Sequence, residues 1–191
     1  NTLDSIIWMA EGRKYEEVVL MTASLARLLR QSISNEDEVV PLAREVEYAK
    51  GYLTIQKMRY KDKLEFEIDV EPSILNIPLI KLVLQPIIEN AIYHGLKYKE
   101  SKGLLQVKGF MKDGNAVLQV IDNGVGMDEE TLSHIYDKHK VNYHSNGVGV
   151  YNVQKRLKLY YGENYGITYE SEKGVGTTAT ITIPGIQEES I

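Results

Sequence analysis

The chain has 191 residues, 43% of them hydrophobic, and a formal net charge of −5. This length fits one globular domain with a small additional segment, and the acidic balance argues against a nucleic-acid partner, which would need a basic surface. The absence of cysteine excludes disulfides, thiolate metal sites and cysteine nucleophiles. No apolar run approaches the ~20 residues that cross a bilayer. Because the sequence starts at Asn1 without a methionine, we expect it to be part of a longer protein.

Residues 1 to about 60 show the apolar spacing of helices. Gly12 marks a break between a first and a second helix, residues 34–37 predict a loop, and Pro41 lies near the start of a third helix. The stripes that define the first two helices are Leu3, Ile6, Ile7 and Ala10, followed by Val18, Val19, Thr22, Leu25, Leu28 and Leu29. Such helices need a packing partner, which is either a second chain in a dimer bundle or the rest of the same chain.

The apolar period changes after residue 63. Alternation over 64–70 predicts a half-buried strand that ends at Pro72. Pro78 is placed to open a helix that runs to about Leu96, and Pro86 inside this pattern predicts either a kink or a loosened turn.

Strands and helices are mixed in the rest of the chain. Strands are predicted at 104–111 and 116–121, joined by a hairpin turn, and at 167–170 and 177–183. Short and long helices are expected near 129–136 and 150–161, the second stopped by Gly162. This order predicts an α+β protein with a two-layer α/β sandwich over residues 61–185, a preceding helical segment over 1–60, and a tail at 186–191.

A first polar cluster lies in the predicted helix before residue 96. No phosphate-binding P-loop and no dinucleotide-binding glycine pattern is present. Asn90, His94 and Lys97 are spaced i, i+4 and i+7, which places them on one helix face beside Glu89. An amide, an imidazole and an ammonium there suit Mg²⁺ and phosphates, whereas the alternative is a solvated polar face.

Two glycine-containing clusters follow. Asp122, at the end of a strand, precedes Gly124, Gly126 and Met127, so a carboxylate that accepts a hydrogen bond from adenine would lie beside a backbone that permits close approach. Gly147 and Gly149 open a helix whose free N–H groups attract phosphate. An ordinary turn is the alternative for each cluster.

Taken together and in this order, these clusters resemble the GHKL ATP-binding fold of histidine kinases and gyrase. The stretch from Leu84 to Ala91 with His94-Gly95 is similar to the N box of LytS/YesM-type sensor histidine kinases. Residues 122–127 resemble the G1 box, residues 147–157 the G2 box, and residues 174–178 the closing Gly-Thr element. The helix before the ATP domain also matches, at Glu45, Tyr52, Gln56, Arg59 and Tyr60.

The resemblance implies roles for individual residues. Asn90 would be the Mg²⁺ ligand and Asp122 the carboxylate that recognises adenine, with ATP and Mg²⁺ as cofactors. The other implied roles are Gly124, Gly126, Met127 and Thr177 around the base, His94 and Lys97 toward the phosphates, Gly147 and Gly149 at the triphosphate, and Glu89 polarising the attacking group. Val150 and Tyr151 depart from the family pattern, and Lys138, His139 and Lys140 of the expected lid are candidates to replace a phosphate contact.

The resemblance also implies an activity for the intact protein. ATP would phosphorylate a histidine just upstream of Asn1, and the phosphoryl group would pass to an aspartate on the receiver domain of a response regulator. The intact protein would be a homodimer anchored in the bacterial inner membrane, with this region in the cytoplasm. The alternatives are a GHKL ATPase that uses Glu89 as general base, a scaffold that has lost nucleotide binding, and a serine kinase of the anti-sigma type.

Overall fold

The computed structural model describes residues 2–33, 38–135 and 147–185. The loop expected at 34–37, the lid candidates Lys138, His139 and Lys140, and the tail at 186–191 lie outside the described residues. The elements, in chain order, are α1 (Thr2–Glu11), α2 (Tyr15–Ile33), β1 (Val39–Pro41), α3 (Leu42–Tyr60), η1 (Lys61–Lys63), β2 (Leu64–Val70), η2 (Pro72–Ile74), β3 (Pro78–Ile80), α4 (Leu84–Asn90), the π-helical η3 (Ala91–Leu96), β4 (Gly103–Lys112), β5 (Asn115–Asp122), α5 (Glu129–Ser133), α6 (Gly147–Tyr161), β6 (Gly166–Glu172) and β7 (Gly176–Pro184).

Five strands form the main sheet, in the order β2-β4-β5-β7-β6. β2 and β4 are parallel, and the other neighbouring strands are antiparallel. The β4–β5 hairpin closes through Asp113 and Gly114, whose φ angles of 50° and 77° match the left-handed turn that fits the twist of two strands. The α+β class predicted from the sequence is confirmed.

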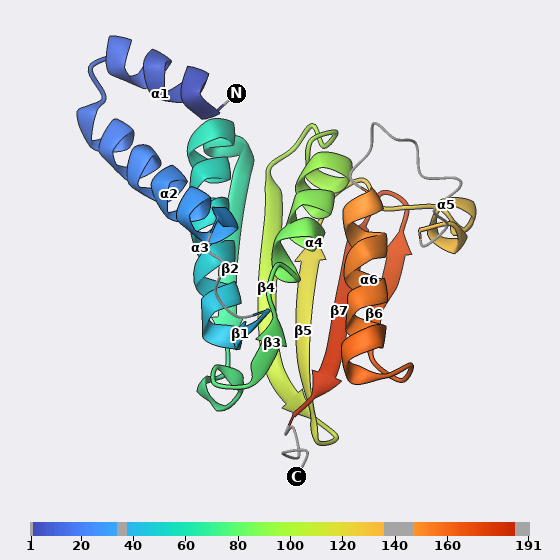
Figure 1. Cartoon of the computed structure of the whole chain (residues 1–191). Coiled ribbons are helices and arrows are strands. Elements are labelled where there is room, and N and C mark those ends of the chain that lie inside the picture. Colours follow the sequence, from blue (N-terminus) through green and yellow to red (C-terminus); the bar gives the residue numbers. More distant parts are fainter. Residues whose placement is uncertain (1, 34–37, 136–146, 186–191) are drawn as a thin grey trace.

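Helices cover one face of this sheet. Figure 1 shows α3, α4 and α6 lying side by side across the strands, which makes the second layer of the sandwich. Because side chains alternate along a strand, every second residue of β4, β5 and β7 points into this layer. The buried apolar residues that these strands contribute to this layer are Leu105, Val107, Ala116, Leu118, Val120, Ala179, Ile181 and Ile183.

The first two helices extend from α3 rather than from the sheet (Figure 1). They meet at the turn around Gly12, and Met9 and Met21 pack with Ile55 of α3 in a small buried cluster. Leu25 packs against the same cluster, while Trp8 and Leu29 are exposed. Part of the apolar surface of these two helices is therefore buried within one chain, and part of it is exposed to solvent.

The single helix predicted from Pro78 to Leu96 is wrong. Residues 78–80 form β3, which pairs antiparallel with β1, a strand that the sequence did not reveal. The helix begins only at Leu84 and changes to a π-helix at Ala91, where Lys97 N donates to Ile92 O at 2.9 Å. A π-helix inserts one residue into each hydrogen-bonded turn, so the faces of the helix shift along this stretch.

Pro86 does not act as the predicted kink. It is the third residue of α4, in the first turn, where a backbone N–H has no intrahelical acceptor to lose. Its missing N–H therefore costs the helix nothing.

Candidate functional site

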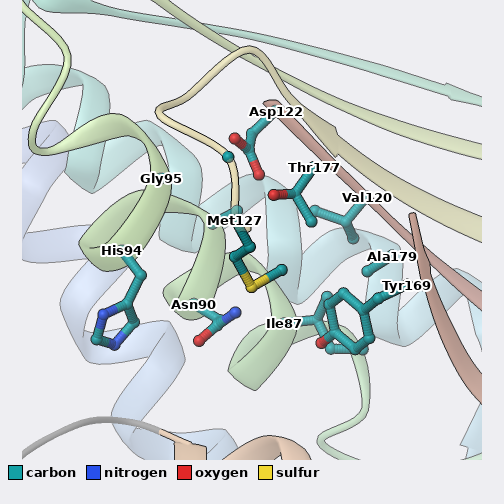
Figure 2. A pocket seen from close by; sticks show the side chains of 12 residues that line it. Ile87, Asn90, His94, Gly95, Val120, Asp122, Met127, Tyr169, Thr177 and Ala179 are labelled. Carbon is teal, nitrogen blue, oxygen red and sulfur yellow. The ribbon is translucent and has the colours of Figure 1, made fainter. Parts of the chain in front are cut away.

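Residues from α4, η3, β5, β6 and β7, together with the loop after β5, line a pocket between α4–η3 and the sheet. Figure 2 shows Asn90 and His94 projecting from the helix and Asp122 and Thr177 from the strands. The lining residues are Ile87, Asn90, Ala91, His94, Gly95, Val120, Asp122, Gly126, Met127, Tyr169, Thr177 and Ala179, around a volume of about 370 Å³ that opens to solvent. Two of the three predicted clusters thus meet at one place.

Asp122 is the buried charge of this pocket. It ends β5, only 6% of it is exposed, and Gly124 N donates to its Oδ1 at 2.8 Å. Burial raises the pKa of Asp122 to about 6, although the Gly124 and Thr177 N–H groups and the charge of Lys99 oppose this rise. The carboxylate is therefore ionised above pH 6 and held in place by the backbone.

Glycines allow the loop after β5 to lie against the helix. A Cβ atom on Gly95 would lie 2.7 Å from Asp122 Oδ1, and one on Gly124 would lie 2.5 Å from the Gly95 carbonyl carbon. Val125 N also donates to Gly95 O at 3.1 Å, which joins the loop to η3. Gly126 has a φ of 63° and has no room for a side chain beside Glu172. These close approaches explain why glycine is needed at these positions.

Asn90 and His94 lie at the helix side of the pocket. Asn90 is the last residue of α4 and is half-buried, whereas His94 is largely exposed in η3. Partial desolvation and the charge of Lys97 lower the pKa of His94, so its imidazole is neutral at pH 7. The pair offers an amide and a neutral ring to a ligand.

Lys97 is not brought to this pocket. It borders a different cavity, with Tyr60, Lys63 and Lys99 among its neighbours. The spacing i, i+4, i+7 assumed an α-helix, and the π-helical turn between Asn90 and Lys97 breaks that face.

Glu89 also lies outside the pocket lining. Its Oε1 accepts a hydrogen bond from Gln85 Nε2 at 3.0 Å. Burial raises the pKa of Tyr52 on α3, and the negative charge of Glu89 raises it further, which places Glu89 on the α3 side of its helix. Gly147 and Gly149 form the first turn of α6. Gly149 is not among the described residues that line the pocket, although a Cβ atom on it would lie 3.3 Å from Pro86 Cβ.

Three further residues near the site, Ser171, Tyr169 and Lys99, were not predicted from their sequence motifs. Ser171 Oγ accepts from Met127 N at 2.8 Å and lies 2.8 Å from Thr177 Oγ1, so it joins the loop after β5 to β7. Lys99 donates to Asn123 O behind the Asp122 loop. Period-two alternation along β6 does put Tyr169 and Ser171 on one face, and that signal was available from the sequence.

Two models of known protein families match this chain. Residues 76–187, more than half of the chain, match the model of the histidine kinase-, DNA gyrase B- and HSP90-like ATPases. This chain belongs to that family. Residues 1–64 match a second model, described as histidine kinase. The resemblance to LytS/YesM-type kinases and the GHKL fold are therefore confirmed.

Curated relatives of this family are longer than the chain. Sensor histidine kinase YesM of Bacillus subtilis is 33% identical over 184 residues, which is 96% of this chain and 30% of YesM. Sensor protein LytS of Oceanobacillus iheyensis is 34% identical over 143 residues, 73% of this chain and 24% of that protein. Sensor histidine kinase BtsS of Escherichia coli is 27% identical over 184 residues, again 96% and 30%. The chain thus spans about 30% or less of these relatives.

Solved structures support the fold of this family member. The catalytic domain of histidine kinase ThkA superposes with a TM-score of 0.60 at 16% identity, over 78% of this chain and 99% of that chain. The histidine kinase domain of the blue-light activated kinase of Erythrobacter litoralis gives 0.56 at 16% identity, over 88% and 72%. Within the described residues, no helix is both long and apolar enough to cross a membrane.

Proposed function

We propose that this chain is the ATP-binding catalytic region of a sensor histidine kinase. The observation that carries the proposal is the buried carboxylate of Asp122 at the floor of a pocket whose helix side presents Asn90. Burying a charge is costly unless the protein or a ligand compensates it. A ligand with a hydrogen-bond donor, such as the exocyclic amine of adenine, would complete the carboxylate's partners.

The pocket is suited to an adenine ring. Gly95, Gly124 and Gly126 let the backbone approach the base closely, and Thr177 lies beside Asp122 (Figure 2). Ile87, Met127 and Tyr169 line the pocket and supply apolar and polarisable surface. Such a ring would lie between flat or flexible side chains while its amine donates to Asp122.

The residues at the helix side suit Mg²⁺ and phosphates. The described residues contain no group of three or more His, Asp or Glu that could hold a metal. Mg²⁺ does not need one, because it is commonly bound by one or two protein oxygens together with phosphate oxygens and water. Asn90 Oδ1 would be the protein ligand, and the ion would neutralise charge on the triphosphate. Neutral His94 would donate to a phosphate, and the N–H groups at the Gly147–Gly149 start of α6 would attract another. Lys97 borders a different cavity, so it would contact a phosphate only after a change in its position.

The transfer we propose moves the γ-phosphoryl group from ATP to a histidine upstream of Asn1 and then to an aspartate of a response-regulator receiver domain. Catalysis of such transfers rests on positioning and electrostatic stabilisation. Glu89 is not among the described residues that line the adenine-side pocket, and its charge acts on Tyr52 of α3. In the kinase, Glu89 would act toward the helical segment.

The helical segment, residues 1–60, would join two copies of the intact protein. Its exposed apolar residues include Ile7, Trp8, Val19 and Leu29. An exposed apolar stripe on a helical hairpin is typical of a bundle interface. Residues 61–185 would be the catalytic domain, held in the cytoplasm by a parent protein that is anchored in the inner membrane.

Calorimetric titration with ADP and a non-hydrolysable ATP analogue, with and without Mg²⁺, tests the proposal. The wild-type chain should bind saturably, and Asp122→Ala should bind about tenfold to a hundredfold more weakly, since hydrogen bonds to charged groups contribute about 1.5–3 kcal/mol. Asp69→Ala, which removes an exposed aspartate of β2, is the control. Equal affinity of Asp122→Ala and wild type, or no saturable binding by a folded wild-type chain, would overturn the proposal.

A further inference from the structure

Glu45 of α3 is a buried carboxylate that the proposed chemistry does not use. Only 1% of it is exposed. Its Oε1 accepts from Leu82 N at 2.7 Å, and its Oε2 accepts from Val83 N at 2.8 Å and Leu84 N at 3.1 Å. These donors come from a segment 37 to 39 residues further along the chain. Glu45 thus connects the helical segment to the catalytic domain.

The three N–H groups belong to the beginning of α4. A helix leaves its first N–H groups without intrahelical acceptors, and Val83 at the N-cap supplies no capping side chain. Glu45 supplies these bonds from another helix, so its carboxyl group lies at the positive end of the helix dipole. Burial raises the pKa of Glu45, and the three N–H donors oppose this rise. The other end of α4 is Asn90, at the pocket. One carboxylate on α3 therefore sets the start of the helix that presents Asn90.

Helix α6 holds the same segment from its other side. Arg156 Nη2 donates to Lys81 O at 2.9 Å, and the charge of Arg156 acts on Glu45. The first turn of α6 contains Gly147 and Gly149, which we place at the triphosphate. We call Glu45, Arg156 and residues 81–84 the polar junction. It joins the helical segment to both helices of the proposed nucleotide site.

Leu82 adds a second, independent observation. Its φ is 61°, in the left-handed region that a bulky residue with a Cβ rarely adopts. Strained backbone of this kind persists only when its surroundings hold it, and it is frequent at switch regions. The bond from Leu82 N to Glu45 holds this conformation. Loss of that bond would let Leu82 relax and α4 shift.

We propose that Glu45 is a positioning residue that couples the placement of α3 to the nucleotide-facing end of α4. This inference rests on the proposed function and adds its regulation: movement of the helical segment changes the position of Asn90 through the polar junction. The coupling is reciprocal, so nucleotide binding also changes the position of α3.

Hydrogen exchange of the chain without nucleotide is the first test. In Glu45→Gln the side chain keeps a single acceptor oxygen, so at least one N–H of residues 82–84 loses its partner. We expect faster exchange at 82–84 and also at 90–97 and in the first turns of α6. Glu47→Gln, an exposed carboxylate on the same helix, should leave these rates unchanged. Faster exchange confined to 82–84 would identify Glu45 as a local cap and overturn the proposal, whether or not the chain binds nucleotide.

Titration with ADP and Mg²⁺ is the second test. Glu45→Gln should bind about tenfold more weakly, a typical coupling between sites, although Glu45 lies outside the pocket lining. Leu82→Gly in the same chain should restore most of the affinity, because glycine adopts a positive φ without strain. Wild-type affinity in Glu45→Gln, or no recovery with Leu82→Gly, would overturn the proposal. If Glu45→Gln does not fold, Arg156→Gln breaks the polar junction from the side of α6. This variant should also bind ADP about tenfold more weakly, and Leu82→Gly should restore most of its affinity. No binding by wild type would instead count against the proposed function alone.

Discussion

The pKa of Asp122 has a consequence for stability that can be measured. Burial raises this pKa from 3.8 to about 6. A carboxyl group with a higher pKa in the folded state binds its proton more tightly there, so it favours folding at low pH. This contribution is lost as the pH rises from about 4 to about 6, and the loss amounts to roughly 3 kcal/mol at about 1.4 kcal/mol per pKa unit.

Asp122→Asn removes this titration. The free energy of unfolding of the variant relative to wild type should therefore rise between pH 4 and pH 7.5, as measured by urea denaturation. Asp69→Asn, at an exposed position of β2, is the matched control. A constant difference between Asp122→Asn and wild type across this range would show that the folded-state pKa of Asp122 is not raised.

Gly95→Ala tests the close approach of η3 to Asp122. Its Cβ would lie 2.7 Å from Asp122 Oδ1, inside van der Waals contact, so the carboxylate would have to move. We expect a loss of about 1–3 kcal/mol in the free energy of unfolding, as is common for overpacked cores, together with a loss of nucleotide binding.

Gly51→Ala is the control for this substitution. Gly51 lies inside α3, and nothing surrounds its Cβ position within 4 Å. Alanine there should raise the free energy of unfolding by about 0.5–1 kcal/mol and leave nucleotide binding unchanged. Equal effects of the two substitutions in calorimetric melting would contradict a steric role for Gly95.

The elements that the sequence predicted well are those with local signals. Alternation over 64–70 and the Asp113-Gly114 turn need only neighbouring residues to be recognised, and both were confirmed. β3 was missed because its apolar residues continue into α4 with only Lys81 between them, and an apolar run does not distinguish a buried strand from a buried helix. Its pairing with β1 depends on residues about 40 positions away.

The site residues show the same limit. Asn90, His94 and Asp122, whose motifs are local in the sequence, line one pocket. Lys97 borders a different cavity, because the π-helical turn, for which no sequence signal was available, shifts it from the face of Asn90. The polar junction joins Glu45 to residues that lie far along the chain. In the sequence, Glu45 was recognised only as a match to the family's motif, and no role followed from that match.

Tyr161 shows how α6 completes the short strand β3. Its hydroxyl donates to Pro78 O at 3.1 Å and accepts from Ile80 N at 3.2 Å. The side chain therefore satisfies backbone groups of a strand in a two-stranded sheet. Tyr161→Phe should lower the free energy of unfolding by about 1–3 kcal/mol, because both groups lose their partner.

Tyr160→Phe is the neighbouring control, since the Tyr160 side chain is exposed. It should change the free energy of unfolding by less than about 0.5 kcal/mol. Urea denaturation of both variants decides the point, and a loss in Tyr160→Phe as large as that in Tyr161→Phe would argue against the hydroxyl bonds.

At the scale of the whole molecule, many of the exposed apolar side chains belong to α1 and α2. These two helices lie away from the sheet (Figure 1). Val19 is 69% exposed there, while α6 exposes Leu159, which is 76% exposed, and its neighbour Tyr160. Scattered exposed residues of this kind are normal on a protein surface, whereas a contiguous group predicts an interface. We therefore expect self-association through α1 and α2 and none through α6.

Val19→Glu and Leu159→Glu form a matched pair for this expectation, because each places one carboxylate at an exposed apolar position of a helix. In sedimentation experiments over a range of concentrations, wild type and Leu159→Glu should approach twice the 21.7 kDa mass of the chain. Val19→Glu should remain at the mass of one chain, because burying an unpaired charge in an apolar interface is costly. A wild-type chain that stays monomeric at all concentrations would show that α1 and α2 do not hold two copies together. Dissociation by Leu159→Glu would move the interface to α6, beside the proposed nucleotide site.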